Sequence, residues 1–160
     1  MFKPDIQLHR LTDVTPELLH KMGVTGLVLD VDNTMITHKG KELIPGLIEW
    51  FTLMDKNGVK LIILSNGKTK RLSAFAARVN LPFLAAGLKP LPFSYWRAVK
   101  KLGLKSRQSA ICGDQIFTDI LGGKLAGLKT ILLTPIEKEN KTSFKIRRYF
   151  EDKLKNRWNT

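Results

Sequence analysis

The chain has few of the residues that build disulfides and transition-metal sites. Its 160 residues include one cysteine, Cys112, and three scattered histidines, His9, His20 and His38. A single cysteine excludes an internal disulfide and a cysteine-based zinc site, and it favours a reducing, cytoplasmic setting. Since no partner pattern surrounds the histidines, we interpret them as surface or capping residues, and Cys112 as a buried strand residue.

Long apolar runs are also missing. No stretch approaches the roughly 18 to 20 apolar residues that a membrane-spanning helix needs, and residues 1–5 lack the apolar core of a signal peptide. The hydrophobic fraction of 43% and the charged fraction of 26% are those of an ordinary globular protein. We therefore expect one domain over residues 1–160, with a core of its own.

Acidic residues are scarce compared with basic ones. The chain has 14 Asp and Glu against 27 Lys and Arg, a net charge of +13. Such an excess indicates an anionic partner, which is nucleic acid, anionic lipid or a phosphorylated substrate. The alternative is a solvated lysine-rich surface without a partner, and composition does not decide between the two.

Two of the few acids stand in the most informative stretch, residues 27–34. The apolar run Leu27–Leu29 leads directly into Asp30 and Asp32, followed by Asn33 and Thr34. Side chains at i and i+2 of an extended chain point the same way, so both carboxylates can reach one small volume. A cation or a shared proton would relieve their repulsion. The alternative is a turn or a helix N-cap, which these residue types also suit.

Strand-like and helix-like segments alternate along the rest of the chain. We expect strands over 26–30, 59–64, 82–85, 109–112 and 129–133. We expect helices within 5–22 and over 45–54, 69–79, 93–102, 119–126 and 143–158. Alternation of this kind predicts an α/β fold, a Rossmann-like doubly wound parallel sheet covered by helices on both faces. The helices between strands are short, so no large cap domain is expected.

Ligands of an open α/β sheet bind beyond the carboxyl ends of its strands. The predicted strands deliver a concentrated set of polar side chains to that edge: Asp30, Asp32, Thr34, Ser65, Asn66, Lys89, Asp114 and Asp119. Clustered carboxylates without His or Cys prefer a hard ion such as Mg²⁺. Lysine and serine side chains hold phosphate oxygens, one carboxylate can attack phosphorus, and a second can move protons. Together these parts predict phosphoryl transfer.

The same residues carry a family resemblance. The pattern Asp30-x-Asp32-x-Thr34, with Ser65, Lys89-Pro90 and Gly113-Asp114-x-x-x-x-Asp119, resembles the four motifs of the haloacid dehalogenase (HAD) superfamily of phosphatases, over about residues 24–134. The fuller patterns are similar to those of the capless, subclass IIIA, YqeG-like family, which is related to mitochondrial phosphatidylglycerophosphate phosphatases.

That resemblance implies roles for individual residues. Asp30 would be the nucleophile and a Mg²⁺ ligand, and Asp32 the general acid and base, with its backbone carbonyl on the ion. Thr34 would orient the loop, while Ser65 and Lys89 would bind the phosphoryl group. Asp114 would be the other carboxylate ligand. Asp119 and Asn66 would support these residues from behind. Asn66 and Gly67 equally fit backbone contact with phosphate or a cap of the next helix. Gln115 is interpreted as a turn residue.

The resemblance favours phosphatidylglycerophosphate as substrate, although a soluble sugar phosphate, a nucleotide or a phosphoprotein remains open. A phosphoacceptor receiver domain has a similar fold, but its phosphorylated Asp lies on a central strand with the acidic pair elsewhere, and the predicted strands 59–64 and 82–85 offer no such Asp. A non-catalytic module that binds RNA or ribosomes through its basic surface is the alternative from another class. The clustered anions argue against it, because they would repel nucleic acid.

We expect a basic C-terminal helix over about residues 141–158, and its helical pattern is read over residues 143–158. Its apolar residues Ile146, Phe150, Leu154 and Trp158 recur every four positions. The stripe predicts either packing against the domain or an interfacial helix that lies on anionic lipid. The second interpretation would make the protein cytoplasmic with peripheral membrane contact.

Overall fold

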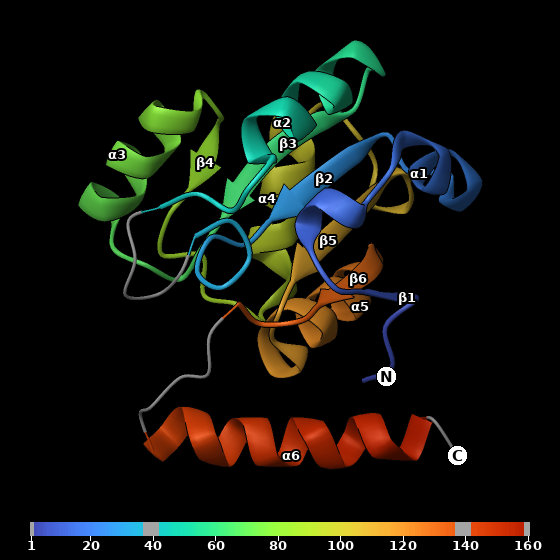
Figure 1. Cartoon of the computed structure of the whole chain (residues 1–160), viewed down its shortest axis with the longest axis vertical. Helices are drawn as coiled ribbons and strands as arrows, with labels where there is room; N and C mark the ends of the chain where they lie inside the picture. Colours follow the sequence, from blue (N-terminus) through green and yellow to red (C-terminus); the bar gives the residue numbers. More distant parts are fainter. Residues whose placement is uncertain (1, 37–41, 137–141, 159–160) are drawn as a thin grey trace.

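The computed structural model describes residues 2–36, 42–136 and 142–158, with the backbone alone for 142–147. Its centre is a six-stranded parallel sheet in the order β1-β6-β5-β2-β3-β4 (Figure 1). The strands are β1 (Ile6–Leu8), β2 (Gly26–Leu29), β3 (Lys60–Leu64), β4 (Phe83–Leu84), β5 (Ser109–Gly113) and β6 (Lys129–Leu133).

Helices connect and cover these strands. The α-helices are α1 (Pro16–Met22), α2 (Leu47–Lys56), α3 (Thr69–Val79), α4 (Pro92–Lys101), α5 (Leu121–Ala126) and α6 (Thr142–Trp158). Two short 3₁₀ turns, Leu11–Asp13 and Ser106–Gln108, and a π-helical segment, Ile116–Ile120, complete the elements.

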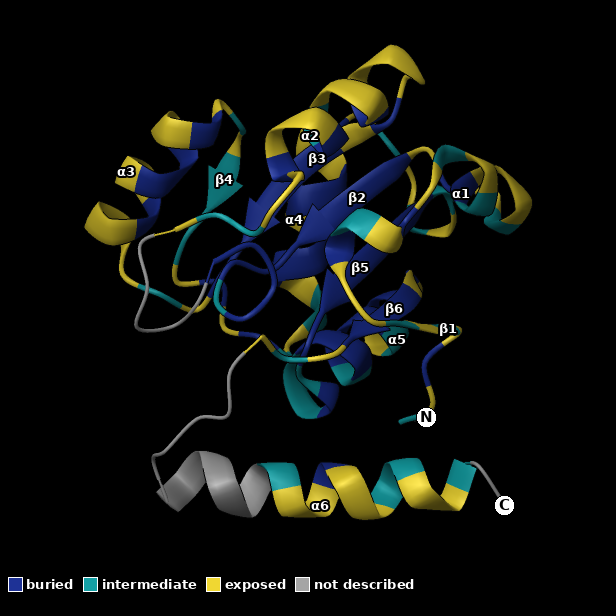
Figure 2. Ribbon diagram, in the orientation of Figure 1, coloured by how far each residue is buried: buried dark blue, intermediate teal, exposed yellow. Residues whose placement is uncertain are grey.

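The central strands are buried on both faces (Figure 2). Along β2, Leu27 and Leu29 belong to a core that includes α1, α2 and α3, whereas Val28 between them belongs to a second core with α4 and α5. This division follows the alternation of side chains along a strand. The predicted doubly wound α/β fold is confirmed.

The structure corrects the N-terminal prediction. Residues 6–8 are the edge strand β1, which pairs with β6, and the helical pattern expected from residue 5 begins only at α1. Thr15 does cap that helix, since its Oγ1 accepts a hydrogen bond from the Leu18 amide at 3.1 Å, and Gly23 ends it in the left-handed conformation.

The chain after β5 also differs from the prediction. The helix expected over 119–126 is preceded by the π-helical segment, which begins at Ile116 and leads directly into α5. Within this segment Asp119 is fully buried, and its carboxylate accepts a hydrogen bond from the Gln115 amide at 3.2 Å.

The C-terminal helix α6 lies along one side of the molecule (Figure 1). The predicted stripe does not pack as a unit: Trp158 contacts the small core of Ile116, Ile120 and Leu132, but Phe150 is 52% exposed. The side chain of Ile146 lies outside the described residues. Among the described side chains of α6, those of residues 148–158, the fully buried one is instead Glu151.

The connections between the described strands are short helices and turns. No cap domain is therefore seen within residues 42–136. No helix among the described residues is long and apolar enough to cross a membrane.

Candidate active site

The predicted polar residues meet at the carboxyl edge of the sheet. Asp30 follows β2, Ser65 follows β3, Lys89 follows the short β4, and Asp114 follows β5. All four are at least nine-tenths buried, together with Asp119 in the π-helical segment. The parallel order of these strands places four separate stretches of sequence in one small volume.

Lys89 joins two of the carboxylates. Its Nζ lies 3.1 Å from Asp30 Oδ1 and 2.7 Å from Asp119 Oδ1, and only 4% of the lysine side chain is exposed. Burial lowers the pKa of Lys89, but the charges of Asp119 and Asp30 outweigh it and raise that pKa overall. The lysine is therefore a fixed cation in the site.

Asp30 has the opposite balance. Burial raises the pKa of its carboxyl to about 6, although Lys89 acts to lower it, and the Asp119 carboxylate adds to the rise. A carboxylate in this environment is poorly solvated, and a nucleophile needs little desolvation there before it attacks.

Asn66 fixes the position of Lys89. Its Oδ1 accepts a hydrogen bond from the Lys89 amide at 2.8 Å, and its Nδ2 donates to the Lys89 carbonyl at 3.2 Å. Ser65 Oγ accepts a hydrogen bond from the Gly67 amide at 3.0 Å. The Asn66 side chain does not cap α3, whose N-cap residue is Lys68, and it holds the lysine loop instead.

Asp114 offers an oxygen without a partner. Its Oδ1 is buried and has no hydrogen bond among the described residues, whereas its Oδ2 pairs with Arg148 of α6. Burial and the nearby Asp30 raise the pKa of Asp114 well above its usual range, against the opposing charge of Arg148. Oxygens of Asp30, Asp114 and Asp119 lie within 4.8 Å of one another, so the cluster can hold a cation.

Within that cluster the three carboxylates are not equivalent. Both oxygens of Asp119 accept hydrogen bonds, from Lys89 Nζ and from the Gln115 amide. Asp114 is the member of the cluster whose Oδ1 has no donor among the described residues, and the pair Asp30 and Asp114 as metal ligands stays a prediction. Gln115 occupies the turn, where its Oε1 accepts a hydrogen bond from the Thr118 hydroxyl at 3.1 Å.

Asp32 lies outside the carboxylate cluster and is paired. Arg71 of α3 donates to it twice, through Nη1 at 3.0 Å to Oδ2 and through Nη2 to Oδ1. Half of the Arg71 side chain is exposed, so the pair borders solvent. The sequence interpretation missed this arginine, although its place in the first turn of a helix at the carboxyl edge was a usable signal.

Thr34 and His9 border a neighbouring cavity. The cavity has a volume of about 360 Å³, and Arg10 and Ile44 are among its other lining residues. Thr34 Oγ1 is buried and has no hydrogen-bond partner among the described residues. His9 is exposed, as expected of a surface histidine, but it stands next to the loop that carries Asp30 and Asp32.

The remaining predicted residues are structural. Cys112 is fully buried in β5, where burial raises the pKa of its thiol, and it packs in the core. His20 lies in the last turn of α1, where a basic residue suits the helix dipole. His38 lies outside the described residues.

Comparison with known sequences agrees with the motif pattern. A family model described as HAD-hydrolase-like matches residues 88–145. A Bacillus subtilis (strain 168) protein named "Probable phosphatase YqeG" is 36% identical over 135 residues, which are 84% of this chain and 78% of the relative.

Two more distant proteins are similar. Phosphatidylglycerophosphate phosphatase 1, chloroplastic/mitochondrial, from Arabidopsis thaliana is 26% identical over 144 residues, which are 84% of this chain and only 41% of that protein. The fold is similar to that of a Legionella pneumophila protein described as a HAD superfamily (subfamily III A) hydrolase, with a TM-score of 0.56 and 19% identity; the match covers 72% of this chain and 68% of the other.

Proposed function

The chain belongs to the YqeG-like family of HAD-type phosphatases, and from that premise we propose that it hydrolyses a phosphomonoester with Mg²⁺ through an aspartyl-phosphate on Asp30. We further propose that its substrate is phosphatidylglycerophosphate, for phosphatidylglycerol synthesis. The observation that carries the proposal is the Lys89 bridge between Asp30 and Asp119, beside the unpartnered oxygen of Asp114.

The residues of the cluster fit a Mg²⁺ ion. Asp114 Oδ1 is a buried carboxyl oxygen without a donor among the described residues, and a cation bound there would stabilise the charged form of this carboxyl against the effect of burial. The donors are carboxylates, which favour hard ions. Asp30 and Asp114 would hold the ion together with the Asp32 carbonyl, and the bound ion would neutralise charge on the phosphoryl oxygens.

The side chains can carry the two chemical steps. In the first, an Asp30 oxygen attacks phosphorus, the bond from phosphorus to the leaving oxygen breaks, and the Asp32 carboxyl gives that oxygen a proton. In the second, Asp32 takes a proton from water, whose oxygen attacks the phosphorus and releases phosphate and free Asp30. Asp32 must leave Arg71 to reach the substrate.

Lys89 and Ser65 would bind the phosphoryl group during both steps. Lys89 is a fixed cation next to Asp30, so it opposes the charge that builds up on the transferring group. The Ser65 hydroxyl already accepts a hydrogen bond from the Gly67 amide, which leaves its proton free to point to a phosphate oxygen. Thr34 would orient the loop between the two catalytic carboxylates.

Three features support a lipid substrate. The Arabidopsis relative is named for phosphatidylglycerophosphate. The site has no cap above it among the described residues, so a bulky head group can enter. The turn that carries Lys89 also exposes Leu88 by 59% and Leu91 by 47%, and these side chains can contact lipid. The proposal includes a cytoplasmic protein in peripheral contact with anionic membrane. Soluble phosphates remain the alternative substrates.

Phosphate release tests the proposal directly. The panel contains phosphatidylglycerophosphate in mixed micelles, a sugar phosphate, a nucleotide and a phosphopeptide, each with Mg²⁺ and with EDTA. We expect the highest kcat/KM on the lipid, no turnover in EDTA and recovery when Mg²⁺ is restored, because the site has oxygen ligands only.

Asp30→Asn should abolish turnover of every substrate, because an amide is a far poorer nucleophile. Asp55→Asn is the matched control, since Asp55 is an exposed carboxylate on α2. Activity of Asp30→Asn close to that of the wild type would refute the covalent step. A better soluble substrate would refute the lipid assignment alone, and no phosphate release from any substrate would favour a binding module.

A further inference from the structure

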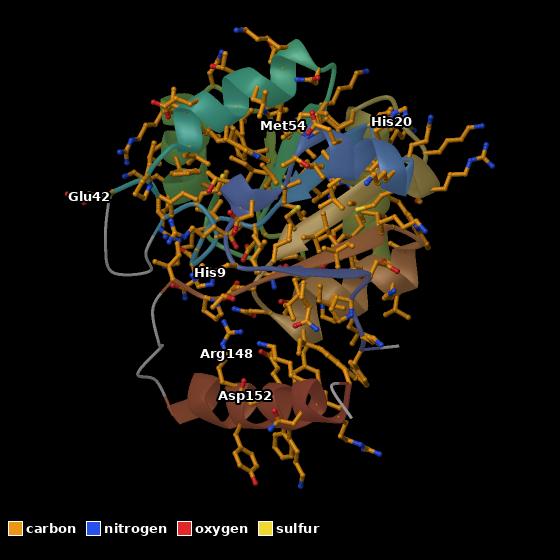
Figure 3. All side chains as sticks on the ribbon, turned by 45° about the vertical axis from the view of Figure 1, so that its right-hand side comes forward. His9, His20, Glu42, Met54, Arg148 and Asp152 are labelled. Carbon is orange, nitrogen blue, oxygen red and sulfur yellow. The ribbon has the colours of Figure 1, made fainter. Side chains whose placement is uncertain are left out.

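Helix α6 directs two charged side chains inward, one helical turn apart. Glu151 is fully buried, and 19% of the Arg148 side chain is exposed. Figure 3 shows Arg148 on the side of α6 that faces the rest of the molecule. Removing two charges from water costs free energy unless each charge has a partner. The partners of Arg148 and Glu151 therefore indicate the role of the helix.

Both side chains contact the turn after β5. Arg148 Nη2 pairs with Asp114 Oδ2, and its Nη1 donates to the Asp114 backbone carbonyl at 2.5 Å. Glu151 Oε1 accepts a hydrogen bond from the Ile116 amide at 3.0 Å, with the Phe117 amide at 3.5 Å. The turn that follows the proposed metal ligand is therefore fastened at several points by one helix.

The pair is also tied together internally. Arg148 Nη1 lies 2.9 Å from Glu151 Oε2, so one carboxylate oxygen holds the arginine and the other holds the turn. The planar guanidinium thus contacts Asp114 through both its side chain and its backbone. This double contact fixes the rotation of the Asp114 side chain.

A fixed rotation has a consequence for the ion. Since Oδ2 is occupied by Arg148, Oδ1 is the oxygen of Asp114 left for the carboxylate cluster, and it is the one without a partner. Side chains that orient metal ligands in this way typically change metal affinity or activity by about 10- to 100-fold when they are removed.

We propose that Arg148 and Glu151 are positioning residues for Asp114, so that α6 is a working part of the phosphatase site. The inference rests on the proposed function, since it takes Asp114 as a Mg²⁺ ligand. It predicts more than attachment of the helix, which Trp158 already provides through its contact with Ile116, Ile120 and Leu132.

The experiment measures Mg²⁺ binding by calorimetry on the full chain, without substrate, and separately measures kcat and KM for p-nitrophenyl phosphate. We expect Arg148→Met to weaken Mg²⁺ binding by about 10- to 100-fold and to lower kcat with little change in KM. Arg148→Lys, which keeps the charge but loses the fork, should lie between Arg148→Met and the wild type. Glu151→Gln should weaken Mg²⁺ binding less, by several-fold, because its amide oxygen can still accept the hydrogen bond from the turn.

Two matched controls separate positioning from a general loss of charge. Arg97→Met removes an exposed arginine of α4, and Asp152→Asn neutralises the exposed acid next to Glu151. Both should bind Mg²⁺ as the wild type does. If Arg148→Met does not fold, as judged by its thermal transition, Arg148→Lys decides the question.

Folded Arg148 variants with Mg²⁺ affinity within twofold of the wild type would overturn the inference and leave the phosphatase proposal intact. Wild-type protein that binds Mg²⁺ but releases no phosphate would refute the proposed function, while the binding data would still test Arg148. A wild-type chain that binds no Mg²⁺ would overturn both.

Discussion

At the scale of single residues, the site depends on how closely backbone and carboxylates approach one another. Gly113 is the last residue of β5, and a methyl group added there would overlap the Asp119 carboxylate. Glycine is required at this position so that Asp119 can reach Lys89. Gly113, which has no side chain, thus permits the ion pair between Asp119 and Lys89.

Gly113→Ala should therefore act on catalysis and on stability together. We expect kcat to fall by at least tenfold, because Asp119 must move away from Lys89, and the free energy of unfolding to fall by about 1–3 kcal/mol, as for other overpacked cores. Steady-state kinetics and urea unfolding measure the two effects.

The matched control is Gly123→Ala, whose methyl group would overlap Ile111 and Thr130 in the core and not the Asp119 carboxylate. It should lose comparable stability and keep kcat. If both variants lose kcat equally, the effect of Gly113→Ala is general destabilisation and not displacement of Asp119.

At the scale of elements, the Asp5 side chain adds to the backbone pairing that holds the edge strand β1 against β6. Asp5 Oδ2 accepts hydrogen bonds from the Thr130 amide at 2.8 Å and hydroxyl at 3.0 Å, and Oδ1 pairs with Lys124 at 3.0 Å. Burial alone would raise the pKa of Asp5, but Lys124 and Thr130 lower it overall. Because that pKa is depressed, the carboxylate stabilises the fold above its unfolded pKa and loses this effect as pH falls.

Asp5→Ala should lower the free energy of unfolding by about 1–2 kcal/mol at pH 7, since the buried Thr130 amide would lose its acceptor. The difference from the wild type should shrink below about pH 4, where the carboxyl is protonated in the unfolded chain. Urea unfolding at several pH values measures it. Asp5→Asn, which keeps an acceptor oxygen, should cost less than Asp5→Ala; an equal cost at every pH would contradict the assigned role of the charge.

The same strand shows where sequence interpretation fails. Ile6–Leu8 is only three residues long, and its partner β6 lies about 125 positions further on, so no local pattern indicates the pairing. The central strands were predictable because each is a β-branched or apolar run that ends in glycine, serine or aspartate. Strand ends also predicted Asp30, Ser65, Lys89 and Asp114 at one edge.

The packing prediction for helix α6 was wrong for a different reason. Its apolar spacing predicted the stripe through Phe150 and Trp158, but the helix buries Glu151. Periodicity predicts apolar burial only, because a buried charge depends on partners that are distant in sequence, here the amides of the turn after Asp114. Arg148 was missed for the same reason.

At the scale of the whole molecule, the excess of positive charge surrounds a negative centre. The chain carries +13 overall, yet the three buried carboxylates of Asp30, Asp114 and Asp119 gather at the sheet edge. A positive exterior attracts anionic surfaces and phosphorylated molecules from a distance, while the buried carboxylates require a cation before an anion can approach them. The two features are compatible with a phosphatase that works at an anionic surface.

We expect the outer face of α6 to contact that surface. Tyr149 and Phe150 are 64% and 52% exposed and lie edge to face, with Lys153 and Arg157 exposed on the following turns. Aromatic side chains with basic neighbours are typical of helices that lie at a membrane interface. Each basic residue near an anionic bilayer contributes about 1 kcal/mol, and salt screens this attraction.

Removing the helix would not test this face cleanly, because it would also remove Arg148. The sharper variant is Tyr149→Ser with Phe150→Ser, which leaves both inward charges in place. We expect the wild type to sediment with anionic vesicles and not with neutral ones, and the double variant to bind about tenfold more weakly, the loss of roughly 1.4 kcal/mol of aromatic contact. The outcome for α6 needs a control of equal apolar exposure elsewhere.

That control is Ile48→Ser with Leu53→Ser, which removes two comparably exposed apolar side chains from α2 and should bind as the wild type does. Equal weakening by both double variants would mean that general apolar exposure, and not α6, drives binding. Activity on p-nitrophenyl phosphate should be unchanged in the α6 variant, whereas activity on vesicle-borne lipid phosphate should fall with binding. A wild type that binds neither vesicle at physiological salt would remove the membrane from the proposal and leave a soluble phosphate as the substrate.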